Sequence, residues 1–154
     1  MTPTRTKPMR QYRKKKRAGN RAPTKAEAAR IVESKFGPCI PCLVWALAGC
    51  MPIEHVPMGV SYDHKKSGNI RRGHGFGYGA CAWHHYGNQV APPQGWTVES
   101  MRTHYGPSLL DGSRVFHATY GSDDELIDLQ SRVLALGSID ESTKRDLLAL
   151  META

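Results

Sequence analysis

Four side chains in two closely spaced pairs have the residue types and spacing of a zinc site. Cys39 and Cys42 form a C-x-x-C pair, and Cys81 and His84 form a C-x-x-H pair. A two-residue spacing lets a tight turn present both side chains to one ion, and two such turns complete a tetrahedron around Zn²⁺. The sequence therefore predicts a structural zinc site that joins two distant segments of the chain.

Three alternatives to this assignment remain open at the level of sequence. The fourth cysteine, Cys50, can replace His84 as the last ligand, or His84 can exchange roles with His85, which follows it directly. The cysteines can also be scattered buried residues that bind no ion. A redox C-x-x-C pair is less favoured, because no βαβ pattern surrounds Cys39.

A second set of residues has the types needed for a base and a second ion. It combines an acid–histidine pair, a histidine in a glycine-rich segment and the histidine beside the zinc ligand, namely Glu54, His55, His74 and His85. Hydrolysis of a phosphodiester needs a base that deprotonates water and a cation that neutralises the leaving oxygen. A carboxylate is chemically suited to Mg²⁺ or Mn²⁺. The set therefore indicates a metal-dependent nuclease.

The order of these motifs resembles that of HNH endonucleases, which have the ββα-metal fold. More narrowly, P-I-E-H-V, R-R-G-H, C-A-W-H-H-Y-G and G-P-S-L-L-D-G-S-R-V-F resemble the phage Ref family, RecA-dependent nucleases that enhance recombination, over roughly residues 29–129. The resemblance implies that His55 is the general base and that His74 and His85 hold or position the catalytic ion, with His74 in a catalytic role. Glu54 lies where HNH proteins carry Asp or His ahead of the base. A RecA filament as partner and a phage or prophage origin are implied by the same resemblance.

Positive charge is concentrated at the N-terminus. The first 30 residues hold eleven Lys or Arg and one acid, whereas the rest of the chain holds ten basic and thirteen acidic residues. Such a segment buries too little apolar surface to order itself, and it can contact DNA phosphates without choosing a sequence. The predicted DNA contacts are Arg13, Lys14, Lys15, Lys16 and Arg17 in this tail, with Arg71 and Arg72 beside the ion site.

Length and composition favour one domain behind a tail. The 154 residues divide into a disordered basic tail over residues 1–23 and an HNH-like nuclease domain over residues 24–154. No apolar run reaches the roughly 18 residues of a membrane span, and the start has no apolar stretch typical of a secretory signal. Four cysteines without such a signal favour a reducing compartment. With the resemblance, this implies the cytoplasm of a bacterial host.

The elements that must position these residues are short. Capping boxes predict helices that begin at Thr24 and Ser122, with Gly37 and Gly137 as their ends, and another helix is expected from about Asp140. The predicted fold class is α+β, with a small ββα-metal (HNH-like) core, a structural zinc site, flanking helices and the disordered basic tail.

The ion site depends on the segment between the two zinc pairs. A strand and turn over residues 53–60 would place His55 on the hairpin of the ββα-metal fold. Residues 62–72 are polar and are expected to form a solvated loop, with Asp63 and His64 on the surface. The alternating glycines between Gly73 and Gly79 are expected to let the backbone bend close to the ion and the DNA.

A zinc-finger-like DNA-binding module without catalysis is the competing interpretation. It explains the cysteine pairs and the basic tail equally well. It leaves Glu54, His55, His74 and His85 without a role. Replacing His55 by Ala distinguishes the two interpretations, because a nuclease would lose cleavage and keep DNA binding.

Overall fold

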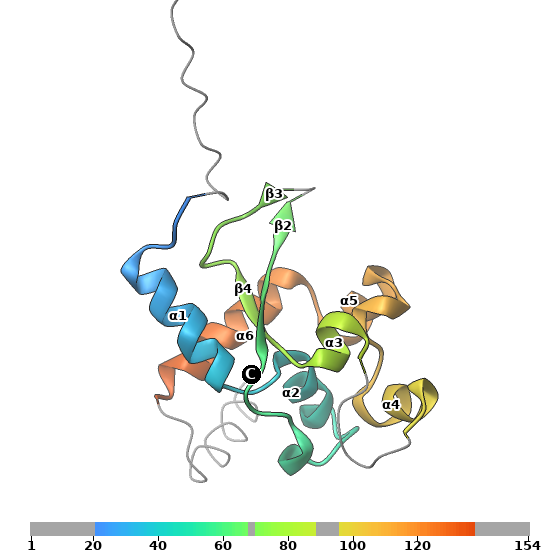
Figure 1. Ribbon diagram of the computed structural model, residues 1–154. Coiled ribbons are helices and arrows are strands. Elements are labelled where there is room, and N and C mark those ends of the chain that lie inside the picture. Colours follow the sequence, from blue (N-terminus) through green and yellow to red (C-terminus); the bar gives the residue numbers. More distant parts are fainter. Residues whose placement is uncertain (1–20, 68–69, 89–95, 138–154) are drawn as a thin grey trace, which may run out of the picture.

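A computed structural model describes residues 21–67, 70–88 and 96–137 (Figure 1). Over these ranges the protein is a small α+β fold in which six α-helices accompany a two-stranded antiparallel sheet and a short second ribbon. The helices are α1 (Lys25–Phe36), α2 (Ile40–Leu47), α3 (Ala82–Tyr86), α4 (Val98–Tyr105), α5 (Ser113–Tyr120) and α6 (Asp123–Ala135), with 3₁₀ turns η2 (Ile53–His55) and η3 (Leu109–Asp111). None of these helices is long and apolar enough to cross a membrane.

The two longest helices begin as the sequence predicts. The Thr24 hydroxyl accepts a hydrogen bond from the Glu27 amide, and the Glu27 carboxylate accepts one from the Thr24 amide. Ser122 and Glu125 form the same reciprocal cap at the start of α6. The two helices lie beside each other (Figure 1), and the Arg30 guanidinium on α1 donates to the Ile127 carbonyl on α6. The further helix predicted from Asp140, and residues 1–20 of the basic tail, lie outside the described residues.

The strands fall later in the chain than predicted. β1 (Ser61–His64) pairs antiparallel with β4 (Gly77–Ala80), and β2 (Lys66–Ser67) pairs with β3 (Ile70–Arg71). The predicted strand over residues 53–60 is wrong, because this segment holds the turn η2 and a single bridge between Pro38 and Met58. The predicted loop over residues 62–72 is also wrong, since it contains β1 and the β2–β3 ribbon. The polar side chains of β1 find partners inside the fold, which hydropathy alone does not detect.

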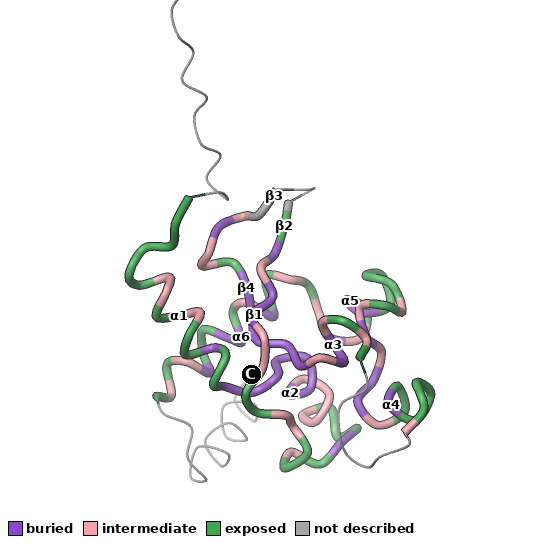
Figure 2. Tube along the Cα trace, viewed as in Figure 1, coloured by how far each residue is buried: buried purple, intermediate pink, exposed green. Residues whose placement is uncertain are grey.

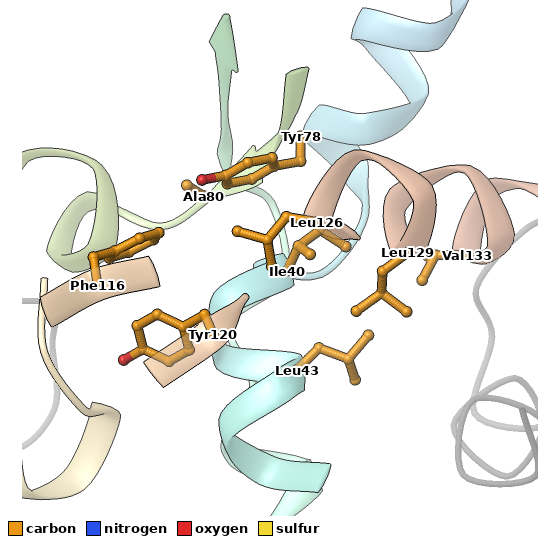
Figure 3. Packing of buried hydrophobic residues seen from close by; sticks show 9 residues of the cluster. All are labelled: Ile40, Leu43, Tyr78, Ala80, Phe116, Tyr120, Leu126, Leu129 and Val133. Atoms are coloured by element: carbon orange, nitrogen blue, oxygen red, sulfur yellow. The ribbon is translucent and has the colours of Figure 1, made fainter. Parts of the chain in front are cut away.

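The main hydrophobic core lies between α2, β4, α5 and α6 (Figure 3). Its buried members are Ile40, Leu43, Tyr78, Ala80, Phe116, Tyr120, Leu126, Leu129 and Val133. Figure 2 shows buried residues along α2 and β4, whereas α1 is largely exposed or half-buried. Phe116 and Tyr120 bring α5 into this core.

A second cluster packs on the other side of α2. It contains three cysteines together with large side chains from α3, α4 and the segment before η2: Cys39, Cys42, Met51, Cys81, Trp83, Met101 and Tyr105. Five of these seven side chains, the three cysteines and two methionines, contain sulfur. The predicted zinc ligands therefore lie where the fold has its second core.

Candidate metal centres

The four residues of the predicted zinc site come together in the structure. One ligand atom from each of Cys39, Cys42, Cys81 and His84 lies within 4.8 Å of all the others, and all four residues are buried. Cys39 caps the start of α2, and Cys81 caps the start of α3. Each two-residue spacing thus spans the first turn of a helix, which turns both side chains toward the same point.

The distances fit a tetrahedral zinc ion. The Nδ1 atom of His84 lies 3.3 to 3.4 Å from the three sulfur atoms, and the sulfurs of Cys42 and Cys81 are 3.9 Å apart. Zinc bonds of about 2.0 to 2.3 Å in a tetrahedron give ligand–ligand separations of about 3.5 to 3.8 Å. The four atoms therefore stand close to the corners of a zinc tetrahedron.

Hydrogen bonds around the cluster fix the orientation of its imidazole. The Nε2 atom of His84 lies 3.1 Å from the Tyr105 carbonyl oxygen and 2.9 Å from the Tyr120 hydroxyl. A carbonyl oxygen only accepts, so Nε2 carries the proton and donates it to Tyr105, and the lone pair of Nδ1 faces the sulfurs. The Cys81 amide also donates to the Cys39 sulfur at 3.2 Å. These are the supporting contacts that metal-binding histidines and thiolates use.

Three deprotonated cysteines in this buried cluster would need a cation to compensate their charge. Burial raises the pKa of the Cys39 and Cys42 thiols well above the ordinary value. Hydrogen bonds from these two residues hold the pKa of Cys81 below its usual range. Three thiolates together in a dry site repel one another unless a cation compensates them. The cluster can thus hold a metal ion such as zinc.

The structure brings His84, and neither Cys50 nor His85, into the cluster. Cys50 is exposed, and its thiol lies 3.9 Å from the Ala48 carbonyl rather than in the cluster. His84 and His85 are neighbours on α3, where successive side chains are turned by about 100° around the helix axis. His84 therefore faces the sulfurs, while His85 faces β1.

A second candidate centre lies between α3 and β1. The Ser61 hydroxyl donates its one hydrogen to the Ala80 carbonyl at 3.0 Å, so its oxygen accepts the Nδ1–H of His85 at 2.8 Å. The Nε2 atom of His85 then carries a lone pair, and it faces Oδ1 of Asp63 at 3.5 Å. Burial lowers the pKa of His85, against the opposing effect of the Asp63 charge, and thereby favours the neutral ring. Two acceptors that face each other in this way favour a cation between them.

The spacing of these two acceptors can be compared with that around a six-coordinate ion. Two adjacent ligands that each lie about 2.1 Å from an octahedral ion are about 3 Å apart. The 3.5 Å between His85 and Asp63 is longer than this value, so the two side chains would have to approach each other to bind a small ion together. The pair offers two ligand atoms to a divalent ion, whose remaining ligands would be water and substrate oxygens.

The predicted acid–histidine pair lies elsewhere. Glu54 and His55 are exposed on η2, and Nδ1 of His55 lies 3.2 Å from Nε2 of His104 on α4. Across the parts of the chain that are described, the Cys39–His84 cluster is the one group of three or more His, Cys, Asp or Glu residues that is close enough to share an ion. The predicted grouping of Glu54, His74 and His85 does not form such a group.

His74 pairs with another histidine. Its Nε2 atom lies 2.6 Å from the Arg21 carbonyl, and its Nδ1 atom lies 3.4 Å from Nε2 of His64. His64 is the last residue of β1 and follows Asp63 directly. Because neighbouring residues of a strand point to opposite faces, Asp63 faces His85 while His64 faces His74.

One of the predicted DNA contacts is already engaged within the protein. The Arg72 guanidinium lies 2.7 Å from the Asp124 carboxylate and 4.7 Å from the centre of the Phe76 ring. The side chain of Arg71 and the basic residues 13–17 lie outside the described part of the structure. Contact of these residues with DNA stays a prediction.

The residues that sequence reasoning missed are Ser61, Asp63 and Lys65. Asp63 was expected on the surface, but it is 9% exposed, forms an ion pair with Lys65, and lies with Oδ1 3.5 Å from Nε2 of His85. The sequence contains two acid–histidine pairs, Glu54–His55 and Asp63–His64, and both have the residue types for an ion site. Lys65 follows the second pair directly. A cationic side chain so close in sequence indicates that the Asp63 carboxylate can be paired.

Comparison with known proteins gives one match. The model of a family described as "Recombination enhancement, RecA-dependent nuclease" matches residues 23–135, which include both candidate centres. Neither the curated proteins nor the solved structures contain a match.

Proposed function

Because the chain belongs to the family of recombination enhancement, RecA-dependent nucleases, we propose that it is a metal-dependent endonuclease that hydrolyses phosphodiester bonds of DNA. The observation that carries this proposal is the facing pair of acceptors formed by Asp63 and His85. The proposal includes a RecA filament as partner and the cytoplasm of a bacterial host as the place of action.

The order of elements around the pair supports an HNH-type nuclease. The strands β1 and β4 form an antiparallel pair, and α3 begins two residues after β4 ends. This is the β–β–α order that the sequence resemblance implies. Asp63 comes from the first strand and His85 from the helix, so the two ligands are held by different elements of one unit.

The chemistry divides between the ion and the protein. An ion held by Asp63 and His85 would supply positive charge that neutralises the leaving oxygen. Ser61 fixes the ring of His85 so that Nε2 stays available. A further histidine takes the proton from the attacking water.

The Cys39–His84 cluster has a structural role in this proposal. Cys39, Cys42, Cys81 and His84 would hold a zinc ion with four protein ligands, which would leave no position for substrate. The cluster holds the start of α2 against the start of α3. Since α3 also carries His85, zinc would fix the position of the ion site.

Cleavage of circular single-stranded DNA tests the proposal. The intact protein is incubated with Mg²⁺ or Mn²⁺, with and without RecA and ATP. Cutting only with RecA supports both the chemistry and the partner, whereas cutting without RecA removes the partner from the proposal. The absence of cutting under every condition would favour the zinc-finger-like binding module.

Two histidines compete for the role of base, and two variants separate them. The resemblance implies that His55 is the base. We add His64 as the second candidate, because it follows Asp63 directly on β1, with its ring on the opposite side of the strand beside His74. We expect His64→Ala to lower the single-turnover cleavage rate about 10²- to 10⁴-fold, the usual contribution of a general base. His55→Ala, whose ring pairs with His104, is the matched variant. A large loss in His55→Ala with normal cutting by His64→Ala would return the role to His55.

Deleting residues 1–20 tests the proposed DNA-binding tail. These residues carry eight Lys or Arg, and each phosphate that a protein neutralises steepens the plot of log affinity against log salt by about 0.7 for single strands. We expect the truncated protein to bind more weakly at low salt and with a flatter salt dependence, measured by fluorescence anisotropy on labelled single-stranded DNA. Cleavage at saturating DNA should be retained. An unchanged salt slope would show that the tail does not contact phosphates.

A further inference from the structure

A lysine is buried between two carboxylates beside the Asp63–His85 pair. Lys65 is 7% exposed, and its Nζ atom lies 2.5 Å from Oδ2 of Asp63 and 3.4 Å from Oδ1 of Asp123. The ammonium also lies 4.3 Å from the centre of the Tyr78 ring. Lysine is rarely buried unless it is paired. The position of Lys65 is therefore set by specific partners.

The two oxygens of Asp63 have different partners. Oδ2 accepts from the Lys65 ammonium, while Oδ1 faces the Nε2 lone pair of His85 at 3.5 Å. A carboxylate that gives one oxygen to an ammonium has one oxygen left for an ion. Asp63 can therefore bind an ion through Oδ1 alone, as a monodentate ligand.

The lysine is held from the far side as well. Asp123 is the first residue of α6, directly after the Ser122 cap, and its Oδ1 lies 3.8 Å from Nε2 of His117. Asp123 and the Tyr78 ring of β4 thus lie against the ammonium from two other elements. The fold therefore maintains the division of the Asp63 oxygens even when no ion is present.

Divalent ions differ in how they use a carboxylate. Ca²⁺ takes about six to eight oxygens and accepts both oxygens of one carboxylate, whereas Mg²⁺ requires an octahedron with bonds of about 2.0 to 2.1 Å. A site restricted to one oxygen of Asp63 disfavours the larger ion. We propose that Lys65 is a specificity-determining residue: by occupying Oδ2 of Asp63, it makes the site take Mg²⁺ or Mn²⁺ in preference to Ca²⁺. This inference rests on the ion site proposed above at Asp63 and His85.

The test compares the binding of two ions to the intact protein. Mn²⁺ and Ca²⁺ are titrated calorimetrically into the wild type and Lys65→Met without DNA. Removing the positive charge of Lys65 strengthens the binding of both ions. The ratio of their two dissociation constants therefore measures the change in preference. We expect the preference for Mn²⁺ over Ca²⁺ to fall about tenfold, in the range for partners that orient metal ligands. Ca²⁺ should also inhibit Mn²⁺-supported cleavage at lower concentrations.

Asp123→Asn provides the matched control. It changes the charge of the same cluster by one unit and removes a partner of Lys65, but it leaves Oδ2 of Asp63 occupied. We expect both dissociation constants to shift together and their ratio to stay at the wild-type value. Lys65→Arg, which returns a cation to the position, should also retain the preference. If Lys65→Met does not give a sharp thermal transition, Lys65→Gln carries the same comparison.

Each outcome bears on the proposal separately from the nuclease assignment. An unchanged ratio in a folded Lys65→Met or Lys65→Gln variant overturns the role of Lys65 and leaves the ion site standing. An equal loss of the Mn²⁺ preference in Asp123→Asn also overturns the role of Lys65. The preference would then depend on the charges around Lys65 in general and not on the occupation of Oδ2 of Asp63. Wild-type Mn²⁺ binding by Asp63→Asn would remove the ion site itself, and the role of Lys65 with it.

Discussion

Replacing Cys42 by Ala is expected to abolish the folded state of the domain. Cys42 is fully buried, and its sulfur faces the cluster. Zinc binding that is coupled to folding contributes about 10 to 16 kcal/mol, which matches or exceeds the roughly 5 to 15 kcal/mol stability of a typical domain. The variant should show no cooperative thermal transition by circular dichroism and less than one zinc per chain by elemental analysis.

Cys50→Ala is the control for this experiment. Cys50 is exposed and lies outside the cluster, so we expect full zinc content and an unchanged melting temperature. A chelator that removes zinc from the wild type should reproduce the Cys42→Ala result. Wild-type stability in a zinc-free Cys42→Ala protein would contradict a structural role for the cluster.

The second large effect is expected at the two proposed ligands of the catalytic ion. Asp63→Asn and His85→Ala should each lower the single-turnover cleavage rate by about 10²- to 10³-fold, a loss typical of removing one electrostatic contact to the transition state. Because both residues hold the same ion, the double variant should be little worse than either single variant. The assay uses saturating RecA-coated single-stranded DNA with Mn²⁺.

Asp128→Asn is the matched carboxylate control. Asp128 lies on α6 with a side chain 70% exposed, and it pairs with Arg132 on the same helix. We expect wild-type cleavage from this variant. Losses that multiply in the Asp63→Asn, His85→Ala double variant would show that the two residues act independently, which contradicts a shared ion.

The features that sequence reasoning found are those with local signals. The two capping boxes each need only four consecutive residues, and both begin helices in the structure. The spacing in each zinc pair is also local, since one helical turn brings both ligands to the same side. Choosing His84 over Cys50 required the tertiary structure, because the choice depends on the direction in which α3 leaves β4.

The ion site could not be placed from sequence because β1 does not look like a strand. Its residues Ser61–His64 are mostly polar, and the partners that make Asp63 compatible with burial are Lys65 and, on α3, His85. The opposing strand β4 is equally atypical, because Gly77 and Gly79 alternate in it. A Cβ atom on Gly79 would lie 2.7 Å from the Val60 side chain and 3.0 Å from the Ser34 carbonyl oxygen. These two glycines therefore serve close packing of β4, where the sequence predicted a bend toward ion and DNA.

Because His84 and His85 are adjacent, insertions and deletions in this part of the domain are restricted during evolution. Helix α3 has five residues, and it ends at Gly87 in the left-handed conformation, with φ of 69°. Inserting or deleting one residue between Cys81 and His84 would rotate both imidazoles by about 100° relative to Cys81 and misdirect them together. Loops elsewhere can lengthen gradually, but no change of length between Cys81 and His84 keeps one centre while the other is altered. Related chains are therefore expected to differ in length almost everywhere except across these few residues.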